Sequence, residues 1–144
     1  MVKSLLFYVN KSLNNGDVGK LLLRLAVGGL MLFHGMHKLL GGVDGIGGML
    51  VEKGLPGFLA YGVLIGEVLA PCLIIVGVLT RPAALVLALT MVAAWLMVGT
   101  SETWHLDETG AWAIESLIYF FISALAIALL GAGRYRLVKG EEWA

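Results

Sequence analysis

Four ionisable side chains lie in or beside long apolar stretches, and they are the residues best suited to chemistry. His34 and Lys38 come near the end of the first stretch, Glu67 lies within the second, and Glu115 lies within the fourth. A charge at membrane depth costs about a few kcal/mol or more, so such residues usually face a bundle interior, a partner or water. Since the two carboxylates can neutralise the cations, we predict that the four side chains form one polar cluster near the outer face.

This cluster has three interpretations that the sequence leaves open. It is an ion-pair network that fixes helix packing, a pocket that binds a small polar or quinone-like head group, or a path for ions or protons. Four basic residues are secondary candidates for ligand binding: Arg24, His37, Arg81 and His105. We expect Arg24 to lie outside the polar cluster, on the inner side. Arg24 either extends toward lipid phosphates or binds a carbonyl or an anion within the bundle, and His105 lies in a polar loop where solvation is expected.

The histidines do not indicate a metal centre. His34 and His37 are spaced three residues apart and do not form the HExxH pattern of a helical zinc site, so we predict no metal.

The first apolar stretch has a distinct polar face. At about 100° per residue, one narrow face collects five residues: Arg24, Gly28, Met31, Gly35 and Lys38. The glycines on this face would let another backbone approach closely.

The elements that must position these residues are transmembrane helices. Hydrophobic residues make up 59% of the chain and charged residues 14%, which is typical of an integral membrane protein. Apolar stretches at residues 18–40, 58–79, 83–98 and 111–130 predict four spans. We therefore predict a single domain over residues 1–144, with an all-α fold in which four antiparallel helices form an integral membrane bundle.

The segments outside the spans also carry predictions. The apolar run within residues 1–15 is too short for a cleaved signal sequence, so we expect this segment to be retained as an interfacial segment. Residues 41–57 are rich in glycine and predict a mobile loop with a short amphipathic turn. Eight of the ten Lys and Arg residues fall on the side that holds both termini, and only Lys38 and Lys53 fall on the other. The positive-inside rule therefore predicts cytoplasmic N and C termini.

Several short motifs occur in a fixed order along residues 18–136. They are Arg24, G-x-x-K at Gly35 to Lys38, Gly-Leu-Pro at Gly54 to Pro56, Glu67, G-x-x-T-R at Gly77 to Arg81, Glu115, and Gly-x-Gly at Gly131 to Gly133. In order and spacing the chain resembles the DoxX family of small four-span bacterial membrane proteins. It departs from the family after the last motif, where Arg136-Leu137-Val138 replaces a frequent Ser-Leu-Asp.

The resemblance implies a location in the bacterial inner membrane and quinone as a candidate cofactor, since the best-known relatives are subunits of a thiosulfate:quinone oxidoreductase. In one function, the protein is a quinone-interacting component in which Lys38 and His34 bind a quinone carbonyl and Glu67 or Glu115 manages the proton. In the alternative, it is a noncatalytic membrane subunit that anchors or assembles a partner. The chain has one cysteine, Cys72, and hence no CxxC redox pair, so a partner or a second bound molecule must supply electrons.

The expected partners are the lipid bilayer and other membrane or redox proteins in a homo- or hetero-oligomer, and not nucleic acid. The third stretch has five alanines and no charge, which suits close packing against another transmembrane helix. The acidic loop around Trp104 and His105 is a second candidate contact surface.

Overall fold

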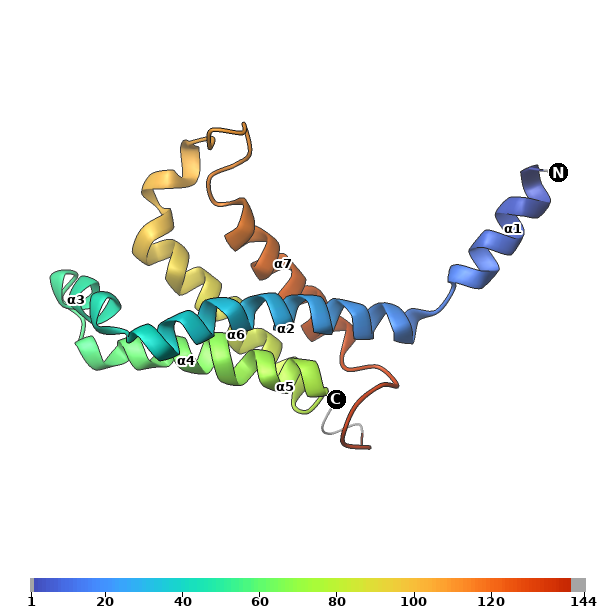
Figure 1. Cartoon of the computed structure of the whole chain (residues 1–144), viewed down its shortest axis with the longest axis horizontal. Coiled ribbons are helices and arrows are strands. Elements are labelled where there is room, and N and C mark those ends of the chain that lie inside the picture. The colour runs from blue at the N-terminus through green and yellow to red at the C-terminus, as the bar shows by residue number, and fades with distance from the viewer. Residues whose placement is uncertain (1, 141–144) are drawn as a thin grey trace.

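Two antiparallel helix pairs make up the membrane part of the protein in a computed structural model, which describes residues 2–140 (Figure 1). The first pair joins α2 (Gly16–Gly41) to a continuous helical segment formed by η1 (Gly57–Tyr61), α4 (Gly62–Leu64), η2 (Ile65–Leu69) and α5 (Ala70–Val76). The second pair joins α6 (Thr80–Ala94), with its extension η3 (Trp95–Gly99), to α7 (Glu115–Leu130). Residues 2–140 contain no β-strand, and the predicted all-α membrane bundle is confirmed.

Three helical segments are long and apolar enough to cross a membrane: Gly16–Gly41, Gly57–Val76 and Thr80–Gly99. α7 is equally apolar but has only 16 residues, or about 24 Å at 1.5 Å per residue. It begins at Glu115 rather than at the predicted residue 111, because the preceding residues form a turn closed by a bridge between Leu106 and Trp112. The fourth crossing therefore stays a prediction for a short helix.

Local chemistry sets the ends of these helices. The Asn15 side chain caps α2 by accepting a hydrogen bond from the Val18 amide at 3.2 Å. α5 ends at Gly77, which adopts the left-handed conformation (φ 75°) that glycine takes without steric cost. α7 ends at Gly131, which also has a positive φ of 72°. These glycines turn the chain back over the inner ends of the helices.

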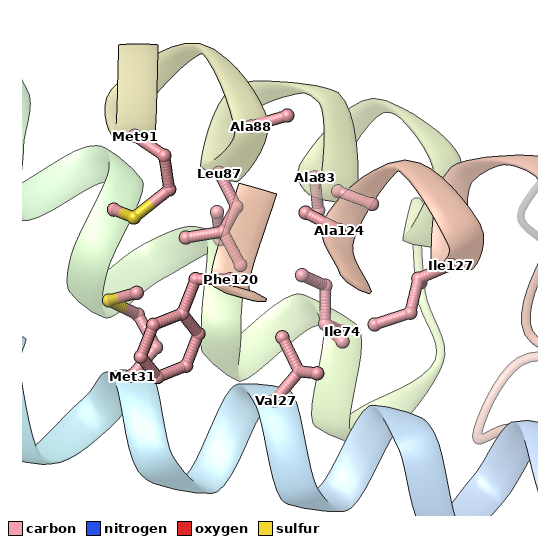
Figure 2. Close-up of a cluster of buried hydrophobic side chains, with 12 residues drawn as sticks. Val27, Met31, Ile74, Ala83, Leu87, Ala88, Met91, Phe120, Ala124 and Ile127 are labelled. Carbon is pink, nitrogen blue, oxygen red and sulfur yellow. The ribbon is translucent and has the colours of Figure 1, made fainter. Parts of the chain in front are cut away.

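The two pairs cross rather than run parallel. In Figure 1, α6 and α7 leave the α2/α5 pair at a steep angle and diverge from it toward the loop that joins them. The hydrophobic core lies at the crossing, where all four helices contribute side chains, among them Val27, Ile74, Leu87 and Ile127 (Figure 2). Because the pairs separate beyond this core, residues near their outer ends are not brought together.

The alanines of α6 serve this core. Ala83, Ala84 and Ala88 are buried, and α6 packs along α7. The sequence analysis assigned these small residues to contact with another protein's helix. That assignment is wrong for these three alanines, because they are buried in the core of this same chain.

Segments at the periphery are helical as well. α3 (Asp44–Glu52) replaces the expected loop and packs on η1 through a small core of Val43, Leu50 and Ala60. α1 (Val2–Leu13) has no buried residue and leads away from the start of α2 (Figure 1). Its exposed apolar side chains and its direction suit the predicted interfacial segment.

Candidate functional site

The polar site in the first helix pair is an ion pair between Lys38 of α2 and Glu67 of η2. Lys38 Nζ lies 2.5 Å from Glu67 Oε1, and it donates a hydrogen bond to that oxygen. The Glu67 side chain is 4% exposed and the Lys38 side chain 31% exposed. Glu67 Oε2 is buried and has no hydrogen-bond partner among residues 2–140. One oxygen of the carboxylate therefore accepts a hydrogen bond and the other does not, whereas the ammonium has further N–H groups that can donate to a ligand.

The backbone around Glu67 explains why its side chain can reach Lys38. Residues 65–69 form a π-helical turn, a feature often found at functional sites. Pro71 follows four residues after Glu67, and it has no N–H group to donate to the Glu67 carbonyl. The freed carbonyl faces Gly35 of α2 so closely that a Cβ atom there would lie 2.1 Å from the oxygen. Gly35 thus permits the close approach that places Glu67 beside Lys38.

The predicted cluster of four side chains is reduced to this pair. His34 is exposed and makes an edge-on ring contact with Phe120 of α7, with a centroid distance of 5.8 Å. Glu115 is exposed at the first turn of α7, and its side chain makes no hydrogen bond or ion pair within residues 2–140. Within residues 2–140, no hydrogen bond or ion pair joins His34 or Glu115 to Lys38 and Glu67, and α7 diverges from α2 toward its outer end (Figure 1).

The two remaining histidines are peripheral. His37 is exposed on α2, opposite the buried face. His105 lies in the outer loop, where its Nδ1 is 2.9 Å from the Ser101 carbonyl oxygen and 3.9 Å from Glu102. No group of three or more potential metal ligands occurs in the described part of the chain.

Arg24 is buried at the opposite end of the polar face, with 1% of its surface exposed. Its guanidinium donates to the carbonyl oxygens of Ile74 and Ile75 at the end of α5, and to those of Ala132 and Tyr135 after α7, at 2.6 to 2.7 Å. Of the two alternatives for Arg24, the structure therefore shows carbonyl binding within the bundle. Arg24 joins three chain segments and lies apart from the Lys38–Glu67 pair.

Arg81 has a similar role. Its guanidinium donates to the carbonyl oxygens of Ala128 and Leu129 at 2.7 and 2.9 Å, and so caps the last turn of α7. Because these carbonyls would otherwise lack donors, Arg81 ties the start of α6 to the end of α7. Both arginines thus donate their hydrogen bonds to backbone carbonyl oxygens. Lys38, in contrast, is a cation of the polar face that is partly accessible.

A cavity that sequence analysis missed lies between the outer ends of α6 and α7. Its volume is about 320 Å³, and its walls include Trp95, Trp112 and Phe121. Both indole N–H groups are already used, because Trp95 donates to the Thr103 hydroxyl and Trp112 donates to the Thr103 carbonyl. The cavity therefore offers an apolar surface. The one feature of the sequence that could have indicated this cavity is the placement of Trp95 and Trp112 on either side of Thr103, which lies in a polar loop.

Asp107 holds that loop in shape. Its Oδ1 accepts hydrogen bonds from the Thr109 hydroxyl, the Ala111 amide and the Thr109 amide. These bonds, with the Thr109 hydroxyl as the largest contribution, lower the pKa of the Asp107 carboxyl below its ordinary value. The loop beside the cavity is thus stabilised by hydrogen bonds within the loop itself.

Chemically, the Lys38–Glu67 pair can hold a small polar group. An ammonium fixed by one carboxylate oxygen can donate its remaining N–H groups to a ligand oxygen, and the buried carboxylate keeps that ammonium in one position. The cavity between α6 and α7 is not lined by Lys38 or Glu67, so a ligand would contact Lys38 from its exposed side.

Comparison with known proteins gives a family match and a named relative. The model of the family described as DoxX matches residues 19–100, more than half of the chain. A protein from Bacillus subtilis (strain 168) named "Putative oxidoreductase CatD" is 33% identical over 90 residues, which are 62% of this chain and 64% of that protein. The match thus covers less than two thirds of that relative. No solved structure matches the chain significantly.

Proposed function

Because the chain belongs to the DoxX family, we propose that it is the membrane component of an oxidoreductase system and that Lys38 binds the head group of a quinone-like molecule. The observation that carries the proposal is the buried, half-satisfied ion pair. A carboxylate oxygen without a partner is costly, and such polar groups in a membrane usually serve a site. The name of the Bacillus subtilis relative favours the same class of activity.

In this proposal the two side chains have different tasks. Lys38, whose side chain is 31% exposed, donates a hydrogen bond to a ligand carbonyl and stabilises the negative charge that reduction places on its oxygen. Glu67 does not contact the ligand but holds the ammonium in position. Two electrons and two protons convert a quinone to a quinol; a partner protein supplies the electrons, and solvent at the exposed side of Lys38 supplies the protons.

The alternative is a noncatalytic subunit that anchors or assembles a partner. The observation in its favour is that three cations of the bundle have partners within the chain: Arg24 and Arg81 bind carbonyls, and Lys38 binds Glu67. In that case the ion pair only locks α2 against the second helical segment.

The proposed location is the bacterial inner membrane, with both termini in the cytoplasm and α3 and the 100–114 loop outside. The distribution of Lys and Arg supports this orientation. Reporter fusions after Glu52 and after Asp107 should both report the external side. A cytoplasmic signal from the second fusion alone would mean that α6 and α7 do not both cross the membrane.

The test is to purify the protein with its native lipids and to measure co-extracted quinone by mass spectrometry. We expect quinone with the wild type and with Lys53→Met, a control that removes an exposed lysine on the same side. Lys38→Met should keep the helical fold, as measured by circular dichroism, but lose the quinone. If the wild type carries no quinone, and both Lys38→Met and Glu67→Gln only lower stability, the noncatalytic function is the better one.

A further inference from the structure

The tail after α7, residues 131–140, is fixed against the inner ends of the first helix pair. The buried Arg24 donates to two of its carbonyl oxygens at 2.6 Å. The Arg134 amide donates to Asp17 Oδ1 at 3.0 Å, and the Leu137 amide donates to the carbonyl oxygen of the last residue of α5 at 2.9 Å. These bonds use the backbone of the tail rather than its basic side chains. The tail therefore crosses the start of α2 and the end of α5 along a defined path (Figure 1).

Three basic side chains at this junction make no hydrogen bond or ion pair in the described part of the chain: Lys20, Arg134 and Arg136. A Cβ atom at Gly133 would lie 3.0 Å from Lys20 Cδ, so the Lys20 side chain runs beside the residue that precedes Arg134. Arg136 follows in the same turn, where its amide donates to the Arg134 carbonyl oxygen at 3.2 Å. Asp17 offsets one of the three positive charges, so these four side chains have a formal net charge of +2.

We propose that these three cations bind the phosphate group of an anionic phospholipid in the leaflet at the inner end of the bundle. Guanidinium groups match phosphate oxygens in geometry, and those of Arg134 and Arg136 are free to donate. Tyr135 and Leu137 alternate with the two arginines and are 45% and 75% exposed, which suits contact with the glycerol and acyl region of the same lipid. Each basic residue near an anionic leaflet strengthens the attraction about fivefold. A zwitterionic lipid has the same phosphate, but its own cation offsets much of this attraction.

Other cations at the inner end are either engaged already or more distant. Arg24 and Arg81 donate to backbone carbonyl oxygens. Lys3 and Lys11 lie on α1, which has no buried residue and leads away from the bundle (Figure 1). They add to the general attraction for an anionic leaflet without forming part of the site. Because the tail carbonyls also hold Arg24, a lipid bound to the tail would stabilise this junction.

The test is native mass spectrometry of the protein in detergent micelles, titrated with phosphatidylglycerol or with phosphatidylcholine of identical acyl chains. The full chain is used, because Glu141 and Glu142 follow the tail in the sequence. We expect the wild type to bind its first phosphatidylglycerol at least about tenfold more tightly than its first phosphatidylcholine. Arg134→Gln combined with Arg136→Gln should weaken phosphatidylglycerol binding about tenfold or more, and Lys20→Gln should weaken it about fivefold.

Three controls separate a lipid site from a structural effect or a general attraction. Arg134→Lys combined with Arg136→Lys keeps both charges and should keep the preference for phosphatidylglycerol. Lys53→Gln removes an exposed lysine at the outer end and should leave both affinities unchanged. Inorganic phosphate, added in place of chloride at equal ionic strength, should not displace phosphatidylglycerol, because it lacks the apolar contacts of a lipid. A variant that only loosened the tail would weaken both lipids together and leave their ratio unchanged.

Equal affinity of the wild type for the two lipids would refute the proposal, and this result needs no variant to fold. The site is also refuted if the double glutamine variant keeps the wild-type ratio, or if Lys53→Gln lowers that ratio equally. Complete displacement by inorganic phosphate would show a site for free anions rather than for a lipid. Because the tail lies at the opposite end of α2 from Lys38, none of these outcomes depends on quinone binding.

Discussion

Gly35→Ala should separate α2 from the helix that carries Glu67. The new Cβ would lie 2.1 Å from the Glu67 carbonyl oxygen and 2.6 Å from its carbon, whereas ordinary contacts begin at 3.4 Å. Since both atoms belong to a backbone, α2 would have to retreat by more than about 1 Å. Overpacking of this kind costs about 1–3 kcal/mol, and the better helix propensity of alanine returns at most about 1 kcal/mol. We expect a net loss of about 2 kcal/mol.

The glycines of α2 supply a graded series of controls. Gly29→Ala meets nothing within 4 Å and should be neutral or slightly stabilising. Gly28→Ala meets the Ile75 side chain at 2.6 Å and the Pro71 carbonyl at 3.0 Å, so it should fall between the other two. The measurement is denaturant unfolding in mixed micelles, followed by tryptophan fluorescence. Equal stability of Gly35→Ala and Gly29→Ala would refute the close approach at Glu67.

Two further predictions concern groups outside the ion pair. Arg24→Met leaves four carbonyl oxygens without their donor and should lower the free energy of unfolding by about 3–5 kcal/mol; Arg24→Lys should recover only part of this, and full recovery would show that charge alone matters. Because the pKa of Asp107 is lowered on folding, its contribution to loop stability should be complete above the ordinary value of 3.8 and be lost as pH falls through the lowered pKa. Hydrogen exchange of the Thr109 and Ala111 amides measures this, and unchanged protection in Asp107→Asn would contradict it.

Helix faces were predictable from the sequence because they follow from the helical period. Four of the five residues predicted on one face of α2 are buried: Arg24, Gly28, Met31 and Gly35. Val27, which was not predicted on this face, is buried beside them. The need of a membrane-buried carboxylate for a counter-charge also predicted that Glu67 would meet a cation. Lys38 was the expected cation because it lies at about the same depth in the membrane as Glu67. That depth follows from the lengths of the helices and their antiparallel order.

Crossing angles were not predictable in the same way. Whether His34 and Glu115 join Lys38 depends on how far α7 diverges from α2, and that angle is set by side-chain packing between segments far apart in sequence. One such contact is Gly66 against Thr90, where a Cβ on the glycine would lie 1.8 Å from the threonine hydroxyl. The carbonyls that bind Arg24 were equally hidden, because two of them belong to the tail after α7, whose path depends on glycines with positive φ.

The contrast between Arg24 and Lys38 bears most directly on function. Both lie on the polar face of α2, and both meet groups of another helix, but Arg24 is enclosed by four carbonyl oxygens whereas Lys38 has one carboxylate oxygen and an exposed side. A planar guanidinium with five donors suits a permanent junction, and a compact ammonium can exchange one partner for another without rebuilding the backbone around it. Arg24, at the inner end of the polar face, thus has a structural role, whereas Lys38, at the outer end, is able to bind a ligand. A ligand is therefore to be sought at Lys38 rather than at the more deeply buried Arg24.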